Sequence, residues 1–173
     1  MLERHGWKLY AHPLFLDQLE RLLASVERAK RSDPKGWQSK ADARVLAAIN
    51  ALMLDRIPRD PLSAEFRQGN TLGKEHRHWF RAKFGGSRFR LFFRADSQAK
   101  VIVYAWVNDR DTLRKAGAAT DPYVVFAKML ANGHPPDEWS ALVAMVQKPD
   151  VVERFVESGE KANLTQDDTS QTP

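Results

Sequence analysis

The chain contains no cysteine and no long apolar run. The absence of cysteine excludes disulfide bonds and thiolate chemistry. No stretch approaches the roughly 20 apolar residues that a membrane-spanning helix needs, and the first ten residues, MLERHGWKLY, hold no apolar signal core. These absences predict a soluble cytoplasmic protein.

The sequence also lacks the short motifs of several enzyme classes. It has no G-x-x-x-x-G-K-[ST] phosphate loop, no G-x-S-x-G nucleophile elbow and no H-E-x-x-H zinc helix. Its five histidines are scattered, so we expect no metal site and no cofactor. His76 and His78 adjoin a basic segment and could act as ligands or proton carriers, although a role in a loop is the simpler interpretation.

Positive charge is concentrated in the middle of the chain, which carries a net charge of +5 overall. Residues 74–115 hold eleven Lys or Arg residues and four acidic ones, whereas residues 150–173 hold six acidic residues and two basic ones. The middle segment is therefore suited to a polyanionic partner. The polar, acidic stretch 158–173 is expected to be a disordered tail after a single domain at 1–157.

The most informative segment is residues 79–95, WFRAKFGGSRFRLFFRA. Apolar and basic residues alternate with period two on both sides of a Gly-Gly pair, which predicts a β-hairpin with a two-residue turn at Gly85-Gly86. The expected register sets Lys83 opposite Arg88, Arg81 opposite Arg90, and Trp79 opposite Phe92.

Cations directly opposite one another destabilise a sheet, so two such pairs indicate a surface built for an anion. A merely solvated basic face is the alternative. The neighbouring Trp79 and Phe92 favour a nucleic-acid surface, because bases stack on aromatic side chains. Fixed cations would stabilise a charged phosphorane, arginine suits bidentate phosphate contact, and Lys83, between Arg81 and Arg88, suits proton transfer.

The order of elements predicts an α+β fold with a small, mainly antiparallel sheet. A strand at residues 6–11 precedes two amphipathic helices, the first opened by His12-Pro13 and the second at about 38–56. The hairpin and a further strand at 100–107 follow, then helices capped by Asp121, Asp137 and Asp150. The helical hairpin would pack on the apolar hairpin face and leave the basic face open.

Four stretches resemble the YhaV toxins of bacterial toxin–antitoxin modules, which belong to the broader RelE-like group. These stretches, spread over residues 6–140, are GWKLYAHPLF, RAKFGGSRFRLFFR, WVNDRDTLRKAG and DPYVVFAKMLANGHPPDEW. The resemblance implies a RelE-like fold with additional C-terminal helices. It also implies an endoribonuclease that cleaves mRNA on the ribosome by metal-independent attack of the 2′-hydroxyl. An antitoxin with an AbrB-type, PrlF-like N-terminal domain would neutralise it.

The resemblance also implies roles for particular residues. RelE-like toxins carry two basic residues around one spacer before the turn, and an arginine in an aromatic-Arg-Leu triplet after it. The implied catalytic residues are Arg81, Lys83, Arg90 and, after the next strand, Arg110. The residues expected to bind RNA are Trp79, Arg88, Phe92, Arg94, Arg114 and Lys115.

Many relatives end in a catalytic Tyr or His, and Tyr123 and His76 are the candidate proton carriers here. Arg114 competes with Arg110 for the last arginine position. Two other functions remain open from the sequence. One is a non-nucleolytic toxin of the RelE/ParE fold that acts on gyrase, and the other is a ribosome-binding or RNA-binding protein without cleavage.

Overall fold

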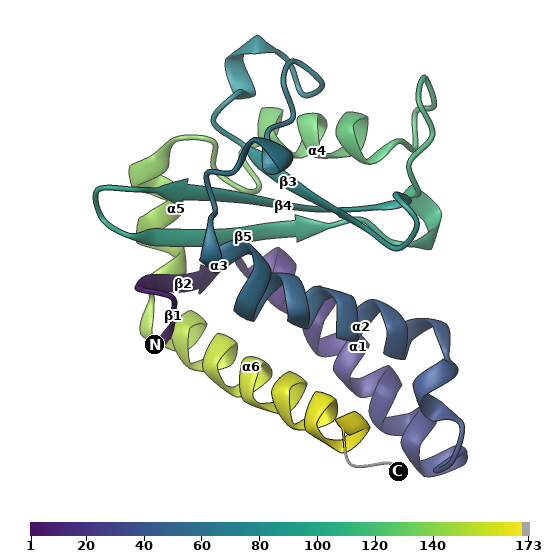
Figure 1. Cartoon of the computed structure of the whole chain (residues 1–173). Coiled ribbons are helices and arrows are strands. Elements are labelled where there is room, and N and C mark those ends of the chain that lie inside the picture. The colour runs from purple at the N-terminus through teal and green to yellow at the C-terminus, as the bar shows by residue number, and fades with distance from the viewer. Residues whose placement is uncertain (171–173) are drawn as a thin grey trace.

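A five-stranded sheet lies in the middle of the molecule, with helices on both of its faces (Figure 1). The computed structural model describes residues 1–170, and for residues 164 and 166–170 the backbone alone. The strands are β1 (Leu2–Arg4), β2 (Trp7–Ala11), β3 (Phe80–Phe84), β4 (Phe89–Asp96) and β5 (Val101–Val107), in the spatial order β1-β2-β5-β4-β3. The predicted α+β class is confirmed.

The sheet is mixed, so the expectation of a mainly antiparallel sheet is corrected. The β1–β2, β3–β4 and β4–β5 pairs are antiparallel, but β2 runs parallel to β5. Parallel neighbours need a long crossover connection, which the two N-terminal helices and the hairpin provide here. Strand β1 was not predicted from the sequence.

Three long helices cover one face of the sheet. They are α1 (Pro13–Ser32), α2 (Ala41–Ala51) and α6 (Pro149–Ser170). Between α1 and α2 lies the short 3-10 helix η1 (Trp37–Ser39), and α2 continues through a π-helical turn η2 (Leu52–Arg56) into α3 (Ile57–Arg59). Leu16, Leu46 and Phe155 are at most 2% exposed and pack in one core with the sheet residues Leu91 and Tyr104. Among the described residues, no helix combines the length and apolarity needed to cross a membrane.

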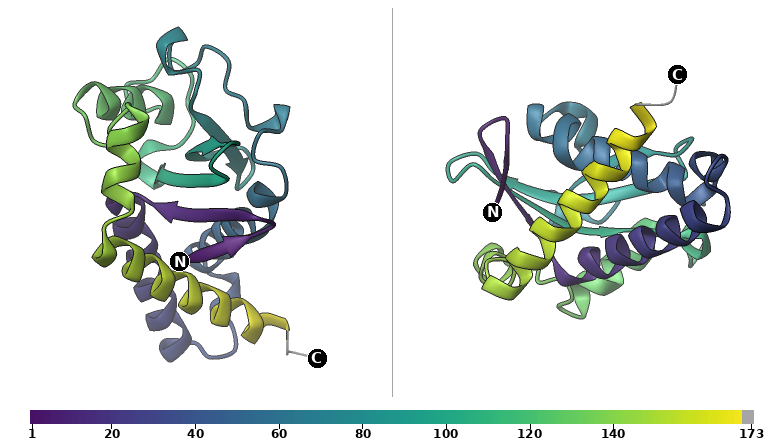
Figure 2. Two further views of the ribbon diagram at one scale, coloured as in Figure 1. Left: turned by 90° about the vertical axis from the view of Figure 1, so that its left-hand side faces the viewer. Right: turned by 90° about the horizontal axis from the view of Figure 1, so that it is seen from below.

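Two shorter helices, α4 (Pro122–Ala131) and α5 (Trp139–Val146), cover the opposite face (Figure 2). Phe126 of α4 stacks on Phe92 of β4 with ring centroids 4.3 Å apart, and it also stacks on Trp106 of β5. Phe92 and Trp79 are 0% exposed in this second core. The prediction that the basic hairpin face stays open is therefore wrong, because helices cover both faces.

The hairpin has the predicted faces but a different register. Lys83 lies opposite Arg90, and Arg81 lies opposite Phe92, two residues away from the expected pairing. The turn contains Gly85, Gly86, Ser87 and Arg88, and the first three of these have φ angles of 61°, 67° and 63°. A register shift of two residues leaves each strand side chain on the same face of the sheet. The alternation therefore predicted the faces correctly, whereas the predicted two-residue turn was too short. Gly85 is required here because a Cβ would lie 2.6 Å from the Phe89 ring.

The C-terminal segment is helical where the sequence predicted disorder. Helix α6 runs to Ser170, and Ser158 and Ala162 are 4% and 2% exposed against the rest of the molecule. Arg154 anchors the helix to α1 through Asp17 and Glu20, at distances of 2.8 and 3.0 Å. The buried face of α6 consists of Val151, Phe155, Ser158 and Ala162, which follow one another at intervals of three or four residues. Residues 171–173 of the predicted tail lie outside the described residues.

The remaining short elements are the 3-10 helices η3 (Ala64–Phe66), η4 (Lys74–His76) and η5 (Arg110–Thr112). Helix η3 lies beside β3, since Arg67 just after it forms an isolated antiparallel bridge with Phe80. Helix η5 follows β5 and begins with a capping box between Asp109 and Thr112. Helix η3 thus lies beside the first strand of the hairpin, and η5 follows the strand that pairs with its second strand.

Helix α1 begins with a buried histidine. The His12 Nδ1 atom accepts a hydrogen bond from Leu14 N at 3.1 Å, while Nε2 is buried without a partner among the described residues. Burial, together with the nearby His134, lowers the pKa of His12 from 6.5 to about 4, against an opposing effect of Asp17. A protonated Nδ1 could no longer accept the capping hydrogen bond.

We expect the free energy of unfolding to fall as the pH drops from about 6.5 toward about 4, because only the unfolded chain gains the His12 proton in that window. His12→Asn keeps a capping side chain that does not titrate, so its stability should depend less on pH. Urea denaturation at pH 7 and pH 4.5 measures this, with His5→Asn at the exposed His5 as control. If the free energy of unfolding falls equally between pH 7 and pH 4.5 in the wild type and in His12→Asn, the lowered pKa assigned to His12 is wrong.

Candidate active site

The phenol of Tyr123 joins the two buried arginines of the hairpin. The Nε atoms of Arg81 on β3 and Arg90 on β4 each donate a hydrogen bond to the Tyr123 hydroxyl at 3.0 Å. The guanidinium of Arg90 also lies 5.7 Å from the centre of the Tyr123 ring. Arg81, Arg90 and Tyr123 are only 9%, 4% and 5% exposed. We call these three residues the arginine–tyrosine cluster.

Asp121 places Tyr123 in the first turn of α4. Its carboxylate caps the helix by accepting a hydrogen bond from Tyr123 N at 3.2 Å, as the Asp-Pro start of the helix predicted. The same carboxylate accepts from Arg114 Nη1 at 2.6 Å and from Lys115 N at 2.8 Å. The Arg114 guanidinium consequently lies 4.9 Å from the centre of the Tyr123 ring. A third cation therefore borders the phenol.

Asn108, at the end of β5, fixes the segment that carries Arg90. Its Oδ1 atom accepts from Arg90 N at 2.6 Å, and its Nδ2 atom donates to the carbonyls of Arg88 and Thr112 at 3.0 and 2.8 Å. The side chain is 3% exposed. Asn108 is not among the residues predicted from the sequence, and its position directly after the apolar strand is the only signal that points to it.

Backbone carbonyls, not carboxylates, accept the other hydrogen bonds of the two arginines. Arg81 Nη1 donates to Glu65 O at 2.6 Å, and Arg90 Nη1 donates to Ser87 O and Phe89 O at 2.8 and 3.0 Å. Each Nη2 has no hydrogen-bond partner among the described residues, and neither atom is sealed off from solvent. The cluster keeps positive charge and free donors for an incoming anion.

The other expected phosphate-binding residues of the hairpin lie at its exposed end. Lys83 is exposed directly opposite Arg90 on β3, and Arg88 is exposed in the turn. Lys115 is exposed beside the part-buried Arg114. Lys83, Arg88 and Lys115 are thus exposed cations close in the chain to Arg81, Arg90 and Arg114, and we call them the cationic border; Arg88 also lines a pocket on the α2 side of the sheet.

Three residues predicted to bind RNA are placed elsewhere. Trp79 and Phe92 are fully buried under α4, so they cannot stack on bases. Arg94 donates to Asp137 O at 2.6 Å, and its guanidinium lies 5.0 Å from the Trp139 ring. Burial lowers the pKa of Arg94 from its usual value, despite opposing acidic neighbours. These three side chains stabilise the second core and its edge.

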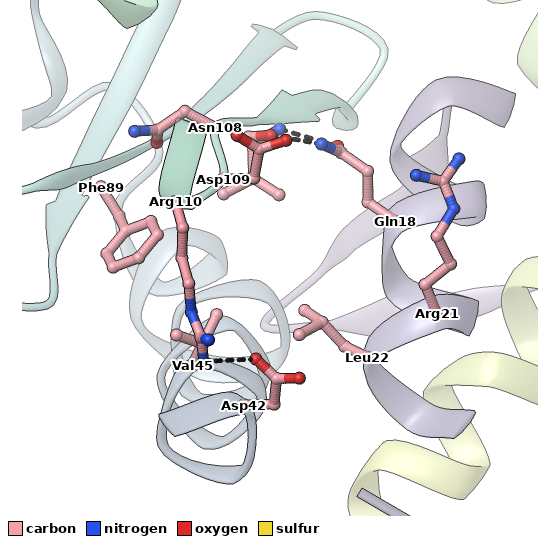
Figure 3. A pocket seen from close by; sticks show the side chains of 10 residues that line it. Gln18, Arg21, Leu22, Asp42, Val45, Phe89, Asn108, Asp109 and Arg110 are labelled. Atoms are coloured by element: carbon pink, nitrogen blue, oxygen red, sulfur yellow. Dashed lines mark hydrogen bonds and ion pairs between the residues drawn. The ribbon is translucent and has the colours of Figure 1, made fainter. Parts of the chain in front are cut away.

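Arg110 lies on the other side of the sheet, against α2 (Figure 3). Its Nη2 atom is 3.0 Å from Asp42 Oδ1, beside a pocket of about 180 Å³ that Phe89 and Val45 also line. The structure thus does not bring Arg110 to the arginine–tyrosine cluster. Arg114, the competing residue, is the arginine that reaches Tyr123.

His76 is also absent from the cluster. It lies with His78 near Asp137, whose Oδ1 atom is 3.2 Å from His76 Nδ1, 2.8 Å from His78 Nε2 and 2.7 Å from the donor Trp79 Nε1. Burial raises the pKa of Asp137, but hydrogen bonds from Trp79 and His78 and the charges of both histidines outweigh it and lower the pKa. Asp137 is the cap that the sequence predicts for the next helix. Glu138 caps α5 instead, accepting from Ser140 N and Ala141 N.

A family model described as "Toxin with endonuclease activity, of toxin-antitoxin system" matches residues 9–147. The chain belongs to the YhaV toxin family. It is 45% identical over 139 residues to Toxin YhaV of Escherichia coli O6:H1 and to Ribonuclease toxin YhaV of Escherichia coli strain K12, covering 80% of this chain and 90% of each relative. No solved structure matches. Family membership implies an antitoxin partner.

We expect Asn108→Ala to lower the free energy of unfolding by about 1–3 kcal/mol, because it leaves the buried amide of Arg90 without its acceptor and removes two hydrogen bonds to the carbonyls of Arg88 and Thr112. Chemical denaturation measures the change, and Asn163→Ala at an exposed position is the control. A loss no greater than that of the control would show that Asn108 does not hold this end of the hairpin.

Proposed function

We propose that this YhaV-family toxin is an endoribonuclease that cleaves mRNA, in association with the ribosome, at the arginine–tyrosine cluster. The observation that carries the proposal is the Tyr123 hydroxyl held by the Nε atoms of both Arg81 and Arg90. A proton donor is thereby placed between two fixed cations. Transfer of a phosphoryl group needs both functions, because negative charge develops on the phosphate and on the leaving oxygen.

The proposed reaction begins when the 2′-hydroxyl of a ribose gives up its proton to solvent water and its oxygen attacks the adjacent phosphorus. The Nη2 atoms of Arg81 and Arg90 bind the non-bridging phosphate oxygens, and Arg114 adds a third positive charge beside the phenol. The two Nε–H groups occupy the lone pairs of the Tyr123 oxygen, so its own O–H is left to donate. That proton goes to the 5′-oxygen as the P–O5′ bond breaks, leaving a 2′,3′-cyclic phosphate and a 5′-hydroxyl.

The exposed cations would bind the rest of the substrate. Lys83 lies opposite Arg90 and has its side chain in solvent, so it is suited to contact the reacting phosphate from the open side. Arg88 and Lys115 are also exposed and would contact neighbouring phosphates of the RNA backbone. We assign no RNA contact to Trp79, Phe92 or Arg94.

The proposed antitoxin has an AbrB-type, PrlF-like N-terminal domain, and an acidic segment of it covers Lys83 and Arg88. The support is the exposed cationic border, whose charge is not neutralised by acidic side chains in contact with Lys83 or Arg88 among the described residues. We further propose that the mixed sheet with two N-terminal helices is a RelE-like fold extended by α5 and α6, in keeping with the hairpin positions of the basic residues.

We expect Tyr123→Phe and Arg90→Lys each to lower the rate of mRNA cleavage about 10²–10³-fold, because each removes a donor that acts in the transition state. Purified variants are compared on translated and untranslated mRNA by primer extension, with thermal melting as the check on folding. Arg110→Ala, which changes a cation on the opposite face, should stay near the wild-type rate. Full activity of a folded Tyr123→Phe variant would reject the proposed proton donor.

We also expect the downstream product to carry a 5′-hydroxyl and the upstream product to end in a 2′,3′-cyclic phosphate or 3′-phosphate. Attack by the 2′-oxygen requires these ends and needs no metal ion. Polynucleotide kinase should label the downstream fragment without prior phosphatase treatment. Fragments that need phosphatase first would carry 5′-phosphates, and attack by a water molecule would then replace the proposed reaction.

A further inference from the structure

His76, His78 and Asp137 form a second cluster of chemically active side chains, apart from the arginine–tyrosine cluster. His76 ends the short helix η4, His78 follows it in the same loop, and Asp137 lies between α4 and α5, about 60 residues further along the chain. One ligating atom of each residue lies within 4.8 Å of the others. None of the three is needed for the proposed cleavage of RNA.

The spacing of these atoms is close to that of ligands around one small cation. Zinc bonds of about 2.0–2.1 Å in a tetrahedral site put neighbouring ligand atoms about 3.3 Å apart. Asp137 Oδ1 is 3.2 Å from His76 Nδ1 and 2.8 Å from His78 Nε2. Small rotations of the side chains would therefore admit a cation among the three atoms, without movement of the backbone.

Groups around the cluster already hold the ligand atoms in place. Trp79 Nε1 donates to Asp137 Oδ1 at 2.7 Å, and Arg94 Nη1 donates to the Asp137 carbonyl at 2.6 Å. On the far side of the His76 ring, Nε2 lies 3.9 Å from the exposed Glu75 Oε1, which is longer than a hydrogen bond. Glu75 would have to move closer to act as the outer-shell carboxylate that orients a ligating imidazole in metal sites.

We propose that His76, His78 and Asp137 bind one divalent transition-metal cation, with Zn²⁺ as the preferred ion. Two imidazoles and one carboxylate are ligands that zinc accepts in proteins, and a fourth position remains for water. The side chains are 15%, 36% and 35% exposed, so a cation can enter from solvent and still gain a partly protected site.

The bound cation would have a structural effect on the toxin. It would tie the loop before β3 to the segment between α4 and α5. Trp79 connects this point to the second core, and Arg81 lies two residues further along the chain. The cation site and the arginine–tyrosine cluster would therefore be connected through one strand, although their chemistry is separate.

The test is calorimetric titration of the chelator-treated full chain with zinc chloride, together with thermal melting. We expect about one equivalent of Zn²⁺ to bind and the melting temperature to rise with zinc concentration, whereas Mg²⁺ should have little effect. H78Q should weaken binding about 100-fold or more, and Trp79→Phe, which removes the indole N–H together with part of a buried ring, about 10-fold. The control is H5Q, because His5 and Asp55 form a similar pair at 3.0 Å but without a second histidine.

Equal zinc affinity in the wild type and H78Q would overturn the proposal, as would a wild-type stoichiometry far below one. A chain that is destabilised by H78Q but binds no zinc would show a hydrogen-bonded cluster without a cation. If H78Q does not fold, the visible spectrum of Co²⁺ added to the wild-type chain decides, because tetrahedral and hydrated Co²⁺ absorb with very different intensity. These measurements use no RNA, so their outcome does not depend on the proposed nuclease activity.

Discussion

The docking of α4 on the second face of the sheet determines where the candidate active site forms. Phe126 packs on Phe92 and Trp106 with all three rings nearly parallel in stacked pairs. Tyr123 lies three residues earlier and therefore points from the same side of the helix. Its ring is perpendicular to that of Phe92, with the ring centroids 5.6 Å apart, and its hydroxyl lies between the two arginines of the hairpin. The apolar packing of one helix thus positions the polar chemistry at its first turn.

The burial of Arg81 and Arg90 has an electrostatic consequence. A buried charge is costly unless hydrogen bonds replace the lost water. Here carbonyl oxygens and one phenol do so, and among the described residues no carboxylate pairs with either guanidinium. Asp121, which precedes Tyr123 by two residues, is engaged with Arg114 and the start of α4. The net positive charge is therefore retained, and an anionic ligand at this position gains the attraction that a resident carboxylate would have cancelled.

The sequence predicted what depends on local pattern and missed what depends on distant contacts. The period-two alternation assigned the residues of the two observed strands to the correct faces, but the predicted two-residue turn was too short, because Ser87 also has a positive φ and Arg88 lies in the turn. One feature of the sequence does indicate that the basic face is covered. Residues 101–107, VIVYAWV, are apolar throughout, as is typical of strands buried on both faces of a sheet. The hairpin pattern indicated that Arg81 and Arg90 bind an anion, and the family resemblance added their catalytic role and Tyr123. Their mutual contact could not be foreseen, because it depends on how α4 crosses the sheet.

The segment from α4 to α5 contributes one residue to the arginine–tyrosine cluster and another to the cluster of His76, His78 and Asp137, and the two residues lie at opposite ends of α4. Tyr123 at the beginning of α4 meets Arg81, and Asp137 beyond its end meets the indole of Trp79. Trp79 and Arg81 are two residues apart, so their side chains leave the same face of the strand region. A shift of α4 along the sheet would have to break contacts at both positions together. The position of the phenol is therefore fixed by apolar packing in the middle of the helix and by polar contacts at each end, which is the rigidity that a preorganised catalytic group needs.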